Sequence, residues 1–172
     1  MKSLTSSEIR FCYLDSPLGR IRISGTTESI SEVHFLDKND NIEPRPGTAS
    51  AFDLIIECRN QLKAYFDGSS QQFNIRLDQR GTDFQQKVWN QLSVIRYGDT
   101  INYLSLARML GDPKVIRAAA AANGRNSIAI LIPCHRVIGS NGDLVGYAGG
   151  LWRKRWLIDH ERKFARGVRT LF

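Results

Sequence analysis

The sequence has little of what would place it outside the globular proteins. Only three cysteines occur in 172 residues, an odd number that does not build a disulfide framework. The 14 glycines and 5 prolines are too few for a collagen-like or low-complexity chain. No apolar stretch approaches the roughly 20 residues that cross a bilayer, and the first ten residues lack the apolar segment of a secretion signal. We therefore expect a globular, cytoplasmic protein with reduced thiols and no membrane partner.

Charge is distributed unevenly between two halves that are each long enough for a small domain. Residues 1–81 hold 10 Lys and Arg against 11 Asp and Glu, whereas residues 82–172 hold 14 against 6. A positive excess confined to one half favours a polyanionic partner for that half, most often nucleic acid. A solvated basic face that maintains solubility is the alternative. The sequence predicts two domains, 1–80 and 81–172.

The first half alternates short strand-like runs with one helical pattern. Ser16-Pro17-Leu18-Gly19 is typical of a hairpin turn, and apolar residues between 51 and 66 recur at helical spacing. The predicted elements are strands over Arg10–Asp15, Arg20–Ser24, Ile30–Leu36 and Gln72–Leu77, a loop over Asp37–Ser50 and a helix over Ala51–Phe66. This order indicates an α/β domain.

The second half is predicted to be mostly helical. In Gly111-Asp112-Pro113, Asp112 is a suitable N-cap and Pro113 a suitable first helical residue, so one helix ends here and another begins. Two short helices joined in this way are typical of a helix-turn-helix. The predicted elements are helices over Phe84–Ile95, Tyr103–Leu110, Pro113–Ala122 and Leu151–Phe164, a strand over Ile128–Val137 and a glycine-rich loop over Gly139–Gly150.

The second helix of this pair combines a run of alanines at 118–122 with a single arginine, Arg117. Alanine is the best helix former, so the run could serve packing alone. Small side chains also let a helix backbone come close to a partner surface. Arg117 has no acidic residue three or four positions away to bind it. The basic surroundings and the helix-turn-helix spacing favour the contact role.

Cys134-His135-Arg136 interrupts an apolar, β-branched stretch, which places the triplet at the edge of a core. A cysteine attacks as the thiolate, and a neighbouring His or Arg lowers its pKa from the usual value of about 8.5. Successive side chains of an extended chain point to opposite faces, so His135 would act on Cys134 through a water molecule or a local turn. A bare Cys-His pair is more often structural.

Glu161 lies on the predicted last helix with apolar residues at every position three and four away. A buried carboxylate without a partner is costly, so its hydrogen-bond donor must come from elsewhere in the fold. A Cys134–His135–Glu161 arrangement would orient the imidazole and stabilise its charged form. A structural ion pair between Glu161 and Arg136 is the alternative.

The other two cysteines, Cys12 and Cys58, are predicted to be small core residues. Together with His34 they could supply three zinc ligands, but their spacings match no finger or ribbon pattern. We therefore expect no metal site.

The segment Ile132-Pro133-Cys134-His135-Arg136-Val137 resembles the active-site signature of the O6-alkylguanine-DNA alkyltransferases. Further segments also resemble the family. They occur in the same order as in its members and extend over nearly the whole chain. They are Asp15-Ser16-Pro17-Leu18-Gly19, Gly81-Thr82-Asp83-Phe84-Gln85 with Val88-Trp89, Asn123-Gly124-Arg125-Asn126, Gly146-Tyr147-Ala148-Gly149-Gly150 and Leu157 to Glu161.

The resemblance implies a fold and a reaction. The fold is a ribonuclease H-like N-terminal α/β domain with a small antiparallel sheet, followed by a mainly helical, winged-helix-like C-terminal domain with the helix-turn-helix. The reaction flips O6-alkylguanine, and potentially O4-alkylthymine, out of duplex DNA and transfers the alkyl group irreversibly to Cys134, once per molecule. It implies no cofactor, binding to double-stranded DNA through the minor groove, and a monomer in solution.

The resemblance also implies residue roles. Cys134 is the alkyl acceptor, His135 the base acting through water, and Glu161 the residue that orients His135. Asn126 braces the active-site turn, and Tyr103 donates to the guanine ring and crowds the target phosphate. Arg117 fills the base stack after the base flips out. The implied DNA-binding residues are Tyr103, Arg117, Ala118, Ala121 and Arg125, and the implied guanine pocket is the Val137 carbonyl, Tyr147 and the Ala148 amide.

Three positions depart from the family pattern. Ser127 stands where many members have Pro, Arg162 where Gly is common, and Thr26 where zinc-binding members have Cys. The competing functions are a non-catalytic DNA-lesion sensor on the same scaffold, a winged-helix transcription regulator and a thiol hydrolase. Cys134 counts against the sensor, Glu161 and the Cys-His-Arg run are unexplained in a regulator, and no oxyanion-hole loop supports a hydrolase.

Overall fold

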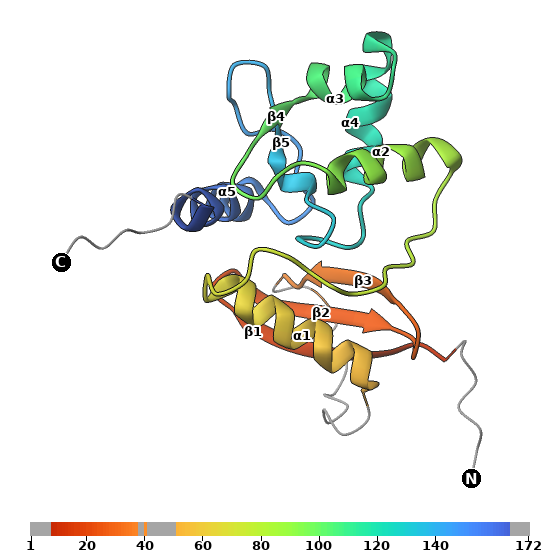
Figure 1. The fold of residues 1–172 in the computed structure, drawn as a ribbon, viewed down its shortest axis with the longest axis vertical. Helices are drawn as coiled ribbons and strands as arrows, with labels where there is room; N and C mark the ends of the chain where they lie inside the picture. The colour runs from red at the N-terminus through yellow and green to blue at the C-terminus, as the bar shows by residue number, and fades with distance from the viewer. Residues whose placement is uncertain (1–7, 38–39, 41–50, 166–172) are drawn as a thin grey trace, which may run out of the picture. The chain divides into compact units, whose positions relative to one another are not determined.

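The computed structural model describes residues 8–37, 40 and 51–165. Most of the predicted loop Asp37–Ser50 lies outside the described residues. The chain divides into two compact units, Met1–Arg80 with Ser127–Ala129, and Gly81–Asn126 with Ile130–Phe172 (Figure 1). None of the helices in the described ranges has both the length and the apolar character that a membrane span requires.

The first unit is a three-stranded antiparallel sheet with one helix packed on it (Figure 1). Its strands β1 (Arg10–Ser16), β2 (Gly19–Gly25) and β3 (Ile30–Phe35) pair in chain order. Ser16 pairs with Gly19 across a two-residue turn, as the hairpin signal predicts. Helix α1 (Asp53–Phe66) buries the face that carries Ile55, Cys58, Leu62 and Tyr65.

The predicted strand over Gln72–Leu77 does not form. Only Leu77 makes a bridge, to Ile30, because the free edge of β3 is shared between two segments. Ile30 exchanges hydrogen bonds with the backbone of residues 76 and 78, and Val33 exchanges them with Ser127 and Ala129. The earlier part of the segment instead binds α1, where the Asn74 amide donates to Gln61 Oε1 at 2.8 Å.

The second unit is mainly helical. Its first helix, α2 (Asp83–Ser93), begins with a capping box in which Thr82 and Gln85 each accept the other's backbone N–H. The predicted helix pair is present: Asp112 caps the turn between the two helices through the Lys114 amide, at 2.8 Å. The remaining elements are β4 (Ile101–Asn102), α3 (Tyr103–Met109), the 3₁₀ helix Pro113–Val115, α4 (Ile116–Gly124), the 3₁₀ helix η3 (Cys134–Arg136), β5 (Val137–Ile138) and α5 (Leu151–Ala165).

The predicted strand over Ile128–Val137 is wrong except at its two ends. Ile128 bridges Val33 in the first unit, and β5 pairs in parallel with β4 in the second. Between them, Ile130 has a φ of 73°, and Pro133 has no N–H to donate to a ladder. The chain therefore turns, and Cys134 begins the 3₁₀ helix η3 instead of lying in a strand.

Candidate active site

Cys134 lies at the start of η3, and its side chain is only 6% exposed. The Asn126 amide nitrogen lies 3.1 Å from the Cys134 sulfur and donates to the Ile132 carbonyl at 2.8 Å. The side-chain amide of Asn126 thus contacts both the Cys134 sulfur and the backbone just before Cys134. A hydrogen bond donated to sulfur stabilises the thiolate more than the neutral thiol.

Glu161 binds both of the partners that the sequence left as alternatives. His135 Nε2 lies 2.7 Å from Glu161 Oε1, and Arg136 makes a two-pronged contact through Nε at 2.8 Å and Nη2 at 3.0 Å. The Gly98 amide adds a fourth donor at 3.1 Å. Burial alone would raise the pKa of Glu161, but the charges and hydrogen bonds of His135 and Arg136 hold it well below its usual range.

These contacts determine where the proton of His135 lies. An ionised Glu161 can only accept, so Nε2 carries the proton and Nδ1 carries the lone pair. Nδ1 is buried and has no hydrogen-bond partner among the described residues. Burial lowers the pKa of His135 in spite of the neighbouring carboxylate. The imidazole is therefore neutral at rest, with one acceptor nitrogen available for a proton.

The expectation that His135 and Arg136 lower the pKa of Cys134 is met only in part, because a backbone hydrogen bond from His135 lowers this pKa but burial acts more strongly. Burial raises the pKa of the Cys134 thiol, and the Asn126 hydrogen bond and the charge of Lys154 only partly oppose this effect. Arg136 is bound to Glu161, and His135 is uncharged. The thiol is therefore protonated until a base removes its proton.

Lys154 is a residue of the site that the sequence analysis missed. Its side chain on α5 is fully buried, and Nζ donates to the Val145 carbonyl at 2.7 Å, within the glycine-rich loop. Burial lowers the pKa of Lys154 to about 8, although the charge of Cys134 acts in the opposite direction. The signal was available, because Lys154 has Leu157 and Ile158 three and four positions ahead, as a buried helical residue would.

Asn123 lies close to both the Cys134 backbone and Tyr103. Asn123, in the last turn of α4, is 2% exposed, and its amide nitrogen lies 3.4 Å from the Cys134 carbonyl and 3.5 Å from the Tyr103 hydroxyl. The Tyr103 hydroxyl also lies close to Gly146 of the glycine-rich loop. In the sequence, Asn123 stands out only as part of the motif Asn123-Gly124-Arg125-Asn126.

The other predicted pocket residues differ in exposure. Val137 is buried on β5, and Ala148 is exposed. Tyr147 is partly buried, and its hydroxyl has no hydrogen-bond partner within the described ranges.

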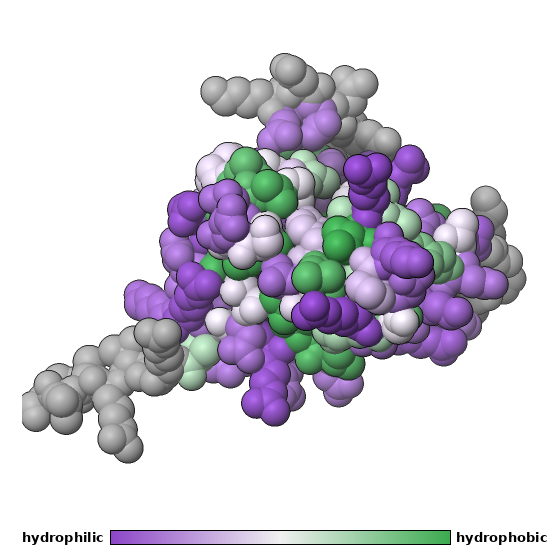
Figure 2. All heavy atoms as spheres, turned by 90° about the horizontal axis from the view of Figure 1, so that it is seen from above, coloured by the Kyte–Doolittle hydropathy of each residue, from purple (hydrophilic) through white to green (hydrophobic). Residues whose placement is uncertain are grey.

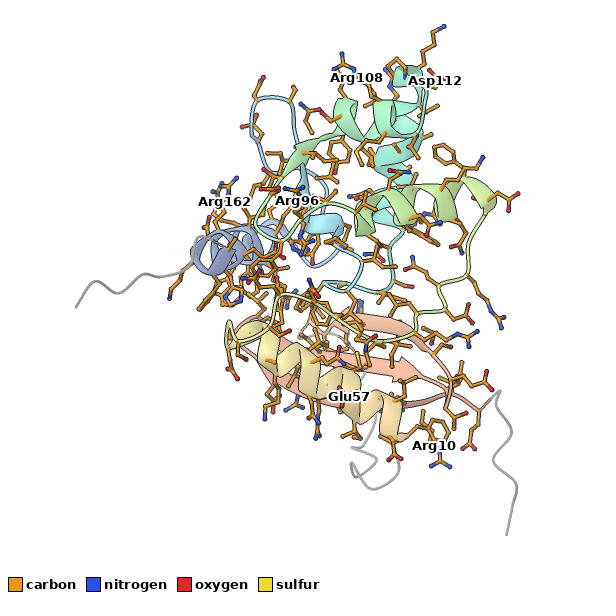
Figure 3. The ribbon with its side chains drawn as sticks, viewed as in Figure 1. Arg10, Glu57, Arg96, Arg108, Asp112 and Arg162 are labelled. Atoms are coloured by element: carbon orange, nitrogen blue, oxygen red, sulfur yellow. The ribbon has the colours of Figure 1, made fainter. Side chains whose placement is uncertain are left out.

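The predicted DNA-binding residues of α4 share one outward face. Buried Ala119 and Ala122 face the interior, where Trp89 Nε1 of α2 donates to the Ala122 carbonyl at 3.0 Å. The exposed residues of α4 and its C-terminal end are Ile116, Arg117, Ala118, Ala121, Gly124 and Arg125. Arg108 and Asp112 project from the same helix pair in Figure 3. Hydrophilic side chains interrupted by apolar patches cover the face shown in Figure 2.

Cys12 and Cys58 are buried in the first unit, as predicted, whereas the His34 side chain is 52% exposed. Burial raises the pKa of Cys12 to about 11 and that of Cys58 to about 12, so neither thiol ionises near neutral pH. Among the residues that the structure describes, no group of His, Cys, Asp and Glu side chains is arranged to hold a metal ion.

Comparison with known proteins identifies the family. Residues 9–79 match the ribonuclease-like domain of the 6-O-methylguanine DNA methyltransferases, and residues 83–163 match their DNA binding domain. The methylated-DNA–protein-cysteine methyltransferase of Mycobacterium bovis is 41% identical over 169 residues, which cover 95% of this chain and 99% of the relative. The chain belongs to the O6-methylguanine DNA methyltransferase family.

Two further members of the O6-methylguanine DNA methyltransferase family extend the comparison. The relative from Methanosarcina acetivorans is 42% identical over 151 residues, which cover 88% of this chain and 97% of the relative. A structure of Mycobacterium tuberculosis OGT in complex with DNA is 40% identical with a TM-score of 0.80, covering 90% of this chain and 93% of that one. The predicted fold is confirmed: a ribonuclease-like domain with a three-stranded antiparallel sheet, and a mainly helical C-terminal domain.

Proposed function

We propose that this chain repairs O6-alkylguanine in DNA by transferring the alkyl group to its own Cys134. Family membership supplies the reaction class, a methylated-DNA–protein-cysteine methyltransferase. The observation that supports these residue roles is the pairing of a buried Cys134, next to Asn126, with a His135–Glu161 contact of 2.7 Å in the same unit. Neither a lesion sensor nor a transcription regulator needs these groups.

The proton leaves the thiol through His135. Nδ1 accepts it by way of a water molecule, and the resulting imidazolium is stabilised because Nε2–H already donates to ionised Glu161. The charge of Lys154 and the Asn126 hydrogen bond then stabilise the thiolate.

The thiolate attacks the alkyl carbon, so a C–S bond forms while the bond from that carbon to O6 of guanine breaks. The electron pair stays on guanine, and a hydrogen bond from Tyr103 stabilises the negative charge that develops there. The product is a thioether, which offers water no carbonyl to attack, so each molecule reacts once. No step requires a metal or a cofactor.

The outward face of α4 fits the minor groove of double-stranded DNA. Exposed Ala118 and Ala121 let the helix backbone come close, while Arg117 and Arg125 lie beside them. A base within the duplex is out of reach of Cys134, so it must rotate out, and Arg117 fills the gap left in the stack.

The everted guanine enters a pocket lined by the Val137 carbonyl, Tyr147 and the Ala148 amide. The domain 81–172 holds all of these groups, and the domain 1–80 supports it. The protein acts as a monomer in the cytoplasm.

Intact-mass analysis tests the proposal directly. The protein is mixed with duplex DNA that contains O6-methylguanine, and we expect one added methyl group, located on Cys134. Cys134→Ser should gain none, whereas the matched control Cys58→Ser should react like the parent, because its thiol is buried in the first unit. An unmodified parent protein, or a methyl group on Cys12 or Cys58, would overturn the assignment.

A further inference from the structure

Two neighbouring residues in the first turn of α5, Arg153 and Lys154, are cationic and yet buried. Cations at this end of a helix oppose the helix dipole, and a buried charge is costly unless its donors meet acceptors. Arg153 Nη1 donates to the Gly149 carbonyl at 2.8 Å. Lys154 Nζ donates to the Val145 carbonyl at 2.7 Å. Both cations thus bind the backbone of the glycine-rich loop, at carbonyls four residues apart.

The loop segment between these two carbonyls has little structure of its own. Residues 144–148 lie outside helices and strands. Among the described residues, this segment makes one backbone–backbone hydrogen bond, in which the Tyr147 carbonyl accepts from the Gly150 amide at 3.0 Å. A segment with so few bonds moves unless side chains of a rigid element hold it. Helix α5 supplies two such side chains, one at each end of residues 146–148.

The Arg153 anchor includes a second contact, to Trp152. The guanidinium carbon lies 4.8 Å from the centroid of the Trp152 ring, which is a cation–π contact. Gly150 lies against the same ring, because a Cβ at this position would be 3.4 Å from Trp152 Cδ1. The exposed indole thus packs on both the buried guanidinium and the end of the loop.

We propose that Arg153 is a positioning residue for methyl transfer, which holds residues 146–148 from their C-terminal side while Lys154 holds them from the other. This inference rests on the proposed function, which places Tyr147 and Ala148 beside the everted base. Arg153 acts through the loop backbone, whereas the charge of Lys154 also lowers the pKa of Cys134. Loss of the Arg153 side chain therefore releases the loop without changing the chemistry of the thiol.

The test replaces Arg153 by methionine, which keeps an unbranched apolar stem and removes the donor. Single-turnover methyl transfer is measured on a duplex containing O6-methylguanine at increasing protein concentration. The second-order rate constant should fall about 10-fold, because only a fraction of the molecules would hold the loop in the competent conformation. Affinity for an unmodified duplex and the shape of the pH–rate profile should stay those of the parent, since α4 and the ionising groups of the site are unchanged.

Three variants complete the design. Arg155→Met makes the same change at an exposed position of α5 and should react like the parent. Arg153→Lys keeps a cationic donor and should recover most of the lost rate. Trp152→Ala removes the ring contact from an exposed position, which the fold tolerates, and should slow transfer about 3-fold even where Arg153→Met does not fold.

Hydrogen exchange distinguishes a positioning role from a purely structural one. In Arg153→Met, the amides of residues 144–150 should exchange faster, while those of α4 keep the protection of the parent. Lost protection in α4 as well would make Arg153 a residue of the fold alone and would overturn the inference. Parent-like transfer in Arg153→Met or, where that variant does not fold, in Trp152→Ala would overturn it too.

None of these results bears against the proposed function, because methyl would still reach Cys134 in the parent protein. A parent protein that takes up no methyl group from the duplex would instead contradict the proposed function.

Discussion

Replacing Glu161 by glutamine tests both roles of the buried carboxylate. It pairs with Arg136, which stabilises the fold, and it stabilises the His135 imidazolium during methyl transfer. Glu161 is 1% exposed and receives four hydrogen bonds, from His135, Arg136 and Gly98. Glutamine has nearly the same shape, but it has one acceptor oxygen in place of two and no charge. The NH2 group of glutamine would point at one of the hydrogen-bond donors that surround the carboxylate, and that donor would then have no acceptor.

The expected loss of stability follows from the ion pair that Arg136 would lose. Its guanidinium is 7% exposed, and Glu161 is its ion-pair partner. Removing one partner of a buried pair costs about 3–5 kcal/mol, a large share of the roughly 5–15 kcal/mol that holds a domain folded. The imidazolium of His135 would also lose its stabilising charge, so methyl transfer should slow by about 100- to 10,000-fold.

The pH dependence of stability gives an independent measure. The pKa of Glu161 in the folded protein lies below its value of about 4.3 in the unfolded chain, so the stability it contributes is fully present above that pH. This contribution is lost as the pH falls toward the folded pKa. The difference in the free energy of unfolding between parent and Glu161→Gln, measured by urea denaturation, should therefore shrink as the pH is lowered from about 5.

The control is Glu57→Gln, the same chemical change on the exposed face of α1 (Figure 3). It should alter the free energy of unfolding by no more than about 0.5 kcal/mol and leave methyl transfer unchanged. If Glu161→Gln costs less than about 1 kcal/mol, the value of an exposed pair, and keeps its transfer rate and pH–rate profile, the reasoning about the buried carboxylate is refuted.

Two further substitutions test the DNA-facing and the electrostatic parts of the site. Arg117→Ala should slow transfer from duplex DNA about 10-fold more than transfer from the free base, because only the duplex has a stack to fill; equal slowing in both assays would contradict that role. Lys154→Met should leave the free energy of unfolding unchanged or higher, because it removes a buried charge whose pKa is lowered to about 8. It should also slow transfer about 10-fold, because the charge of Lys154 lowers the pKa of Cys134 and this effect would be lost. Unchanged single-turnover rates would show that the Lys154 charge does not act on the thiolate.

Features that depend on neighbours in the chain could be predicted from the sequence. The hairpin at Ser16–Gly19 and the break at Asp112 between two helices form where local patterns place them. The burial of Glu161 is of the same kind, because its apolar helical neighbours are visible in the sequence. Such features arise from backbone preferences and from hydrogen bonds that span a few residues.

Features that depend on distant segments were decided only by the tertiary structure. Gln72–Leu77 has strand-like residues, yet the edge of β3 that it would need also pairs with residues 127–129. Glu161 binds Arg136 as well as His135 because three separate segments meet at one carboxylate. The protonated state of the Cys134 thiol follows from burial by residues far away in the chain. Strand pairing, the coverage of a group by distant segments and the resulting electric field are properties of the assembled unit, and no local pattern of residues encodes them.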